Sequence, residues 1–213
     1  MSARLAAIAQ FIGLVAGLFG LTVQFSISVP ATVNMGWSVG GAIVWFFSYF
    51  TILTNILAVC VLVATVRARR HGQEGFLASP MMKGNVLVSI TIVMLIYHFA
   101  LASLWAPKGL FYLCDILLHY VAPVSFIVWW LSAGADGRTT WRDPFWWLIY
   151  PLAYGIYALV RFALTGYAPY PFLDASNGWG PVFANMANLL LVFMVLGGVA
   201  VLIDRQLMSK RRA

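Results

Sequence analysis

The segment DILLHYVAP (residues 115–123) places an acid and a base inside an otherwise apolar run. Asp115 and His119 are four residues apart, so on a helix they share one face and can form a hydrogen bond. A carboxylate that holds one imidazole nitrogen leaves the other nitrogen free to act as a base. Pro123 cannot donate to the carbonyl of His119, which predicts a kink in this helix. Ionisable side chains at membrane depth cost at least about 2.5 kcal/mol and mark functional sites by default.

The sequence SYFTILTN is the second candidate, because it places Thr51, Thr54 and Asn55 on one helical face. Hydroxyl groups in membrane helices usually bond their own backbone or a neighbouring helix. A threonine becomes a nucleophile when a base removes its proton, and His119 is the candidate base. Asp115 would then orient the imidazole, and the amide of Asn55 would donate to a developing oxyanion. These roles resemble a Ser-His-Asp site assembled from helices.

Two further ionisable residues, His98 and Arg161, lie in other apolar segments. Counting at about 1.5 Å per residue from the predicted outer helix ends gives depths of roughly 18 Å for Thr51, 8 Å for Asp115, 14 Å for His119, 10 Å for His98 and 7 Å for Arg161. Four helices thus contribute polar groups to one half of the bundle, which favours a shared site with His98 and Arg161 in supporting positions. The alternative is that Asp115 and Arg161 neutralise each other and His119 is a packing residue.

The elements that must position these residues are membrane spans. Of the 213 residues, 62% are hydrophobic and 9% charged, and the mean hydropathy is +0.90. Soluble domains are about half apolar and a quarter charged, so the composition predicts an all-α integral membrane protein with one domain and no separate soluble domain. A span takes about 20 apolar residues. Six segments qualify: 5–29, 38–66, 84–105, 110–131, 144–165 and 181–203.

The net charge of +7 reflects topology and does not indicate a nucleic-acid partner. Eleven of the thirteen basic residues fall in the two tails or in alternate gaps between spans. This positive-inside pattern predicts that the N and C termini are both cytoplasmic, in a cell-membrane protein whose basic ends contact lipid. Five tryptophans are expected at the inner membrane edge: Trp129, Trp130, Trp141, Trp146 and Trp147.

The outer gap after the fifth span contains YPFLD, and its residues are Tyr170, Pro171, Phe172, Leu173 and Asp174. Prolines and aromatic rings in such a loop are typical of an ordered cap over the mouth of the bundle. A simple interfacial anchor is the alternative.

Three motifs together resemble a known family. They are YFT at 49–51, HYVAPVSF at 119–126 and TGYAPYPFLD at 165–174, in the family's order. The chain is similar to the androgen-induced membrane proteins, which hydrolyse fatty acid esters of hydroxy fatty acids, and to their bacterial Pr6Pr-type relatives. The resemblance implies an intramembrane threonine and histidine at Thr51 and His119. Thr54, one turn away, stays open as the alternative nucleophile, and animal members have an amide where Asp115 stands.

The sequence therefore predicts an intramembrane hydrolase of lipid esters, with Thr51 as nucleophile and His119 as base. Its partners would be a fatty-acyl ester substrate and membrane lipids, and neither a metal nor an organic cofactor is implied. One rival is a transporter that moves protons or anions past Asp115, His119, His98 and Arg161. The other is a non-catalytic membrane scaffold.

Overall fold

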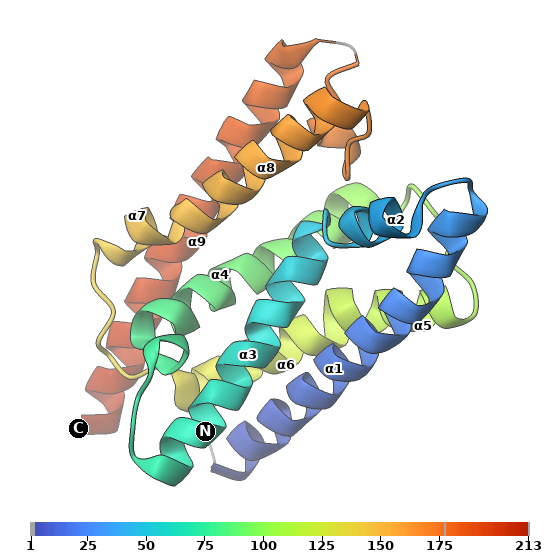
Figure 1. Ribbon diagram of the computed structural model, residues 1–213. Coiled ribbons are helices and arrows are strands. Elements are labelled where there is room, and N and C mark those ends of the chain that lie inside the picture. Colours follow the sequence, from blue (N-terminus) through green and yellow to red (C-terminus); the bar gives the residue numbers. More distant parts are fainter. Residues whose placement is uncertain (1–2, 177, 213) are drawn as a thin grey trace.

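The computed structural model describes residues 3–176 and 178–212, and these residues form helices and loops with no strand. Six helices are long and apolar enough to span a membrane, so the chain is a multi-pass membrane protein (Figure 1). The α-helices are α1 (Ala3–Asn34), α2 (Val39–Phe46), α3 (Phe50–His71), α4 (Pro80–Ile96), α5 (Leu110–Ile116), α6 (Ala122–Trp129), α7 (Asp143–Trp147), α8 (Ile149–Thr165) and α9 (Trp179–Arg212). Single π-helical turns join or extend them at η2 (Tyr97–Leu101), η3 (Leu117–Val121) and η4 (Trp130–Gly134), and short 3₁₀ turns lie at η1 (Phe76–Ala78) and η5 (Pro171–Leu173).

Five of the six predicted spans coincide with observed helices, apart from their ends. For the second span, the sequence predicts one continuous helix over 38–66. This prediction is wrong, because residues 47–49 separate α2 from α3. The buried Ser48 stabilises this break, since its Oγ donates to the carbonyl of Val44 and its own carbonyl accepts from Tyr154 Oη at 2.9 Å. Backbone groups that leave a helix in an apolar interior need such partners.

Local sequence signals explain several helix ends. Ser79 caps α4 by accepting the N–H of Met82, and Pro80 follows at the first helical position, where its missing N–H costs nothing. Gly72 ends α3 in the left-handed conformation at φ 70°, and Gly166 ends α8 in the same way at φ 74°.

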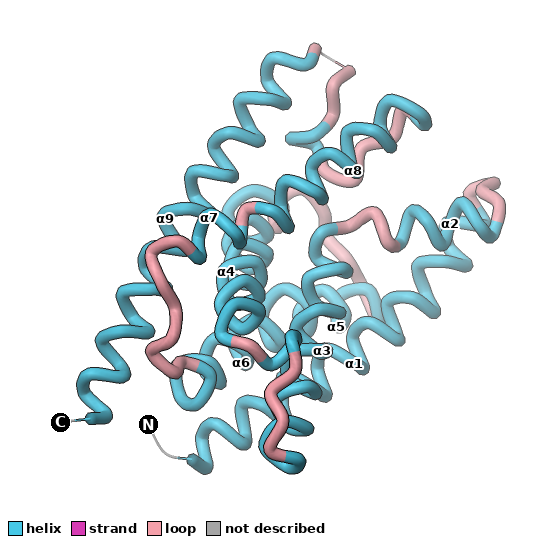
Figure 2. The backbone as a smooth tube through the Cα atoms, turned by 60° about the vertical axis from the view of Figure 1, so that its left-hand side comes forward, coloured by secondary structure: helices cyan, strands magenta, loops and turns pink. Residues whose placement is uncertain are grey.

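The first helix packs closely against its neighbours through small residues. Figures 1 and 2 show α1 beside α3 and α6, with α4 further inside and the α8–α9 hairpin along the opposite edge. A Cβ added at Gly17 would lie 2.6 Å from Val59 Cγ2, and one at Gly20 would lie 2.9 Å from Leu118 Cδ2. Glycines at such positions let helix backbones approach where no hydrophobic effect drives association. Both termini lie at the same end of the bundle (Figure 1).

Burial divides the apolar side chains into a core and a lipid-type surface. Trp141 and Trp146, which the sequence predicts at the inner membrane edge, are exposed. Trp129, Trp130 and Trp147, for which the sequence predicts the same position, are at most 1% exposed and belong to the main hydrophobic core, so their rings do not face lipid. Large apolar side chains instead cover the outer faces, as at Leu164, which is 80% exposed.

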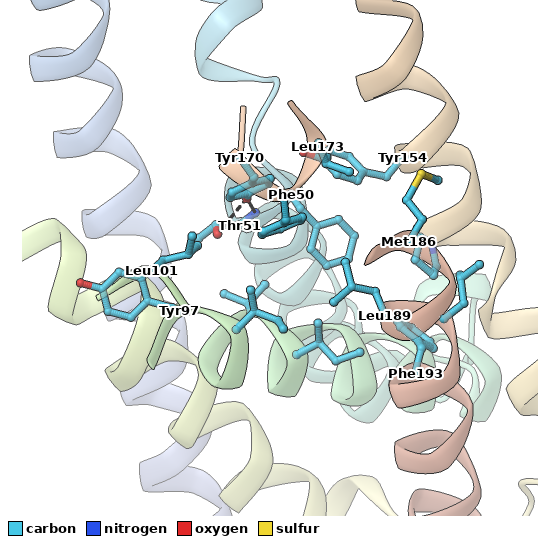
Figure 3. A pocket seen from close by; sticks show the side chains of 17 residues that line it. Phe50, Thr51, Tyr97, Leu101, Tyr154, Tyr170, Leu173, Met186, Leu189 and Phe193 are labelled. Carbon is cyan, nitrogen blue, oxygen red and sulfur yellow. Dashed lines mark hydrogen bonds between the residues drawn. The ribbon is translucent and has the colours of Figure 1, made fainter. Parts of the chain in front are cut away.

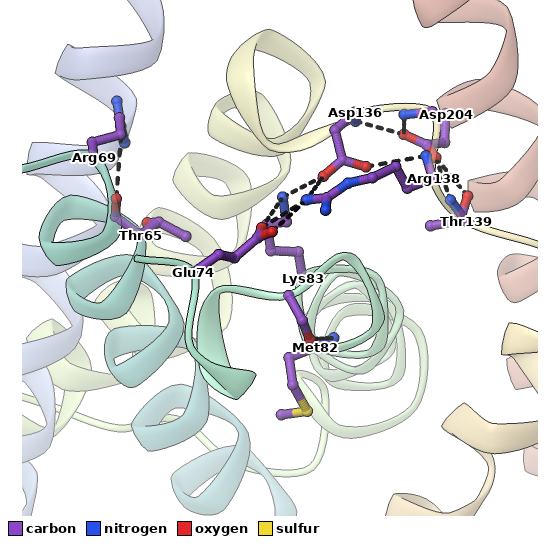
Figure 4. Close-up of polar contacts among 11 residues, drawn as sticks. Thr65, Arg69, Glu74, Met82, Lys83, Asp136, Arg138, Thr139 and Asp204 are labelled. Carbon is purple, nitrogen blue, oxygen red and sulfur yellow. Dashed lines mark hydrogen bonds and ion pairs between the residues drawn. The ribbon is translucent and has the colours of Figure 1, made fainter. Parts of the chain in front are cut away.

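An ion-pair cluster joins the loops at the end of the bundle that holds the termini (Figure 4). Lys83 Nζ lies 2.7 Å from Asp136 Oδ2, and Arg138 Nη2 contacts both Asp136 and Glu74 within 3.0 Å. Burial by itself raises the pKa of Asp136, but the hydrogen bonds from Lys83 and Arg138 outweigh it and hold the pKa of this carboxyl below its ordinary value.

Next to this cluster, the buried carboxylate of Asp204 ties α9 to the loop between η4 and α7 (Figure 4). It accepts the backbone N–H groups of Asp136, Gly137 and Thr139 at 2.9–3.1 Å and the hydroxyl of Thr139 at 2.6 Å. A carboxylate with four donors is well satisfied although it is buried, so the loop is held firmly.

Candidate functional site

The site begins where the second and fourth spans meet. Thr51 is the second residue of α3, and its Oγ1 lies 3.4 Å from Nε2 of His119 on the π-helical turn η3. Thr51 is 9% exposed and the His119 side chain 12% exposed. Catalytic hydrogen bonds are often long before substrate binds and shorten in the complex, so this distance suits a nucleophile and its base.

Asp115 orients the imidazole as its spacing predicts. His119 Nδ1 lies 3.2 Å from Asp115 Oδ1 and 3.0 Å from the Asp115 backbone carbonyl. Both neighbours are acceptors, so Nδ1 carries the proton and Nε2 presents its lone pair toward Thr51. The pairing of Asp115 with Arg161, the alternative left open by the sequence, does not occur.

Tyr97 completes this group, and the sequence reasoning missed it. Its ring stacks on the His119 imidazole with a centroid distance of 3.8 Å, and its hydroxyl donates to Asp115 Oδ2. Tyr97 therefore contacts both the ring face of His119 and the carboxylate oxygen of Asp115 that does not face the imidazole. The sequence pattern indicates the neighbouring His98 instead, because histidine is ionisable and tyrosine is ordinarily neutral. The signal for Tyr97 was its polar hydroxyl inside an apolar segment, where such a group requires a partner.

Both halves of this group lie on π-helical turns. Tyr97 opens η2 and His119 lies in η3, where the N–H of Ala122 reaches back to the carbonyl of Leu117. Pro123 directly follows Ala122 and has no N–H to give to His119, so the wider turn accommodates the missing bond. The expected kink thus takes the form of a π turn, a feature frequent at functional sites.

Two donors lie beside the Thr51 hydroxyl. Tyr170 Oη is 3.4 Å from Thr51 Oγ1, and it accepts the backbone N–H of Thr51 at 3.3 Å (Figure 3). That N–H belongs to the first turn of α3, where helical N–H groups have no partner within the helix. Helix N-termini favour negative charge, so this position suits a developing oxyanion.

The structure does not favour the oxyanion role expected for Asn55. Its Nδ2 donates to the carbonyl of Thr51 at 2.9 Å and to that of Leu118 at 3.1 Å, which occupies both amide protons. Asn55 instead joins α3 to η3 and thereby fixes the relative position of Thr51 and His119.

Two other candidates lie away from the base. Thr54 Oγ1 bonds Tyr150 Oη at 3.0 Å, so of the two threonines only Thr51 contacts His119. His98 is exposed and bonds Tyr120 Oη at 3.1 Å, which makes it a surface residue. The break before α3 removes the basis for counting the depth of Thr51 from the start of a longer helix, but its contact with His119 shows that the two residues share one level of the bundle.

Arg161 is buried but separate from this group. Its guanidinium lies 4.7 Å from the centroid of the Trp45 ring, and it has no ion-pair partner among the described residues. It is therefore wrong to count Arg161 as a support for His119 or Asp115.

An apolar cavity opens beside Thr51 (Figure 3). Side chains from α3, α4, η2, α8 and α9 line it, and Thr51 and three tyrosines are the only hydroxyl-bearing ones. The cap residues Tyr170, Phe172 and Leu173 close one side, and Asn185 Nδ2 holds the carbonyl of Phe172 at 3.1 Å. The YPFLD segment is thus an ordered cap, with Pro171 and Asp174 exposed on its outer face.

Within residues 3–176 and 178–212, no group of three or more His, Cys, Asp or Glu side chains is arranged to hold a metal ion. No protein-family model, curated protein or solved structure significantly matches this chain.

Proposed function

We propose that the protein is an intramembrane hydrolase of lipid esters in which Thr51 is the nucleophile and His119 the base. The contact between Thr51 Oγ1 and His119 Nε2, with Nδ1 of the same ring on Asp115, carries this proposal. A hydroxyl, a base and an orienting carboxylate in series form the arrangement that activates alcohol nucleophiles.

The reaction is acyl transfer in two halves. Thr51 Oγ1 attacks the ester carbonyl carbon as its proton moves to His119 Nε2, and the resulting oxyanion is stabilised by the Tyr170 hydroxyl and the start of α3. His119 then protonates the leaving alkoxide oxygen, which releases the alcohol and leaves acyl-Thr51. Water attacks this acyl ester, passes its proton to His119, and the proton returns to Thr51 as the fatty acid leaves.

The substrate class follows from the cavity wall. Apolar side chains such as Ile96, Leu189 and Phe193 surround the route to Thr51, which suits an acyl chain entering from lipid. The motif resemblance to the androgen-induced membrane proteins supports fatty acid esters of hydroxy fatty acids as the substrates. The distribution of the basic residues supports cytoplasmic termini and a cavity in the outer half of the cell membrane.

A transporter would need its ionisable groups along one route. Asp115 and His119 are paired, whereas His98 lies at the surface and Arg161 lies over Trp45. These separate positions favour neither a proton path nor an anion path. A non-catalytic scaffold predicts that Thr51→Ala and His119→Ala leave the protein's function unchanged.

The first experiment measures ester hydrolysis by the purified full-length protein in nanodiscs, together with labelling by a fluorophosphonate probe. Thr51→Ala is expected to abolish labelling and to lower kcat by at least about 10³-fold, because the nucleophile is lost. Thr54→Ala is the matched control, since it removes another buried hydroxyl one turn away and should retain most activity.

Thr51→Ser keeps the hydroxyl and is expected to keep the labelling. Probe attachment that persists in Thr51→Ala, or hydrolysis unaffected by both Thr51→Ala and His119→Ala, would show that this site is not catalytic.

A further inference from the structure

A second cavity lies between the start of α2 and the end of α8, with a volume of about 380 Å³. Val44, Val160 and Leu164 give it an apolar wall, and Gly40 contributes bare backbone. Arg161 is its only charged lining residue. It is more open to the surroundings than the cavity beside Thr51, and the two share no lining residue.

Arg161 has donors with nothing to bind. The residue is 6% exposed, and its Nε and Nη1 are buried without a hydrogen-bond partner among the described residues. The Trp45 ring beneath the guanidinium offers a cation–π contact but accepts no in-plane hydrogen bond. A buried charge that lacks an ionic partner is strongly unfavourable.

The chain itself cannot supply the missing anion, because all six of its carboxylates are engaged elsewhere. Their partners are Arg138 for Glu74, His119 for Asp115, Lys83 for Asp136, Thr140 for Asp143, Ser176 for Asp174 and Thr139 for Asp204. The cavity therefore lies beside a buried guanidinium that has no ionic partner among the described residues, and its walls are otherwise apolar.

We propose that this cavity binds the anionic headgroup of an amphiphile, a carboxylate or phosphate at the end of an apolar chain. The planar guanidinium suits bidentate binding of either oxyanion. The valine and leucine side chains would contact the first methylene groups of the chain. Because the two cavities share no residue, this site does not depend on the proposed hydrolysis.

The test measures binding of radiolabelled oleate to the full-length protein in uncharged detergent, with oleyl alcohol as the neutral ligand of equal chain length. Wild type is expected to bind oleate at least about tenfold more tightly than oleyl alcohol, since charge-assisted hydrogen bonds are strong. Arg161→Gln should remove this preference. Displacement of oleate by phosphatidate would show that the site accepts phosphate as well as carboxylate, and failure to displace would show that it is selective for carboxylate.

Two further variants separate binding from folding. Gly40→Leu fills the cavity while Arg161 stays intact, because nothing lies within 4 Å of a Cβ at this position, and it should weaken oleate binding about tenfold or more. Arg205→Gln is the matched control, since Arg205 also lies over a tryptophan ring, 5.6 Å from Trp141, and this variant should bind normally. Oleate and oleyl alcohol binding equally to wild type, or oleate binding undiminished in Gly40→Leu, would overturn the proposal.

Discussion

At the scale of single residues, contacts rather than residue types select the candidate nucleophile. Thr51 and Thr54 lie on the same face of α3, and both are buried. Only Thr51 has an imidazole nitrogen and a tyrosine hydroxyl beside it, whereas Thr54 is bound to Tyr150. A shift of one helical turn therefore decides whether a hydroxyl lies beside a base that can activate it as a nucleophile.

Tyr97→Phe tests the orientation of the base. The ring keeps its stacking on His119, but the hydrogen bond to Asp115 is lost. We expect kcat for ester hydrolysis to fall roughly tenfold, the scale of one hydrogen bond to a charged group, about 1.5 kcal/mol, while KM stays unchanged. Tyr97→Leu, which also removes the stacking, should lower kcat further. Equal activities for wild type and both variants would show that Tyr97 has no orienting role.

At the scale of elements, departures from regular helix place the functional groups. The break between α2 and α3 puts Thr51 at a helix start, and the π turns η2 and η3 carry Tyr97 and His119. Close packing between helices also occurs away from these irregular segments. Among the described glycines the closest approach is at Gly84 of α4, where an added Cβ would overlap the ring of Trp147.

Gly84→Ala is expected to destabilise the protein, because neither a helix backbone nor a fully buried indole can move away without disturbing the core. Overpacking of this kind costs about 1–3 kcal/mol. The measurement is thermal unfolding in detergent. Gly180→Ala is the control at a helical position with nothing within 4 Å of the new Cβ, and it should unfold at or above the wild-type temperature. A Gly84→Ala protein as stable as Gly180→Ala would contradict this packing.

At the scale of the whole molecule, the two ends of the bundle carry different structural features. One end carries the cavities and the YPFLD cap. The end with the termini carries the ion pairs of Lys83, Asp136, Arg138 and Glu74, which join loops far apart in the sequence. Asp204 adds α9 to this network. The network at the end with the termini thus connects α4 and α9, which also line the cavity beside Thr51.

The cluster predicts how stability depends on pH. The pKa of Asp136 is lower in the folded protein than in the unfolded chain, so the unfolded chain takes up this proton first as pH falls. The ionised Asp136 carboxylate contributes its full stabilisation above the ordinary aspartate pKa of about 3.9. This stabilisation disappears as the pH drops through the lower pKa that Asp136 has in the folded protein. Asp136→Asn should lower the melting temperature at pH 7 and flatten its decline between about pH 5 and 3. An unchanged acid profile would exclude Asp136 as a contributor.

The sequence by itself determined the class and the local pairings. Composition and segment length suffice for six spans, and the spacing of four residues suffices for the Asp115–His119 contact, because both depend only on neighbours along one helix. The tertiary structure decided which hydroxyl meets the imidazole, that Tyr97 and Tyr170 join the site, and that both amide protons of Asn55 are bound to backbone carbonyls. It also broke the second span at Ser48 and left Arg161 alone over Trp45. These outcomes depend on how helices rotate and pack against one another, and a pattern read along one segment carries no record of the side chains that face it from another.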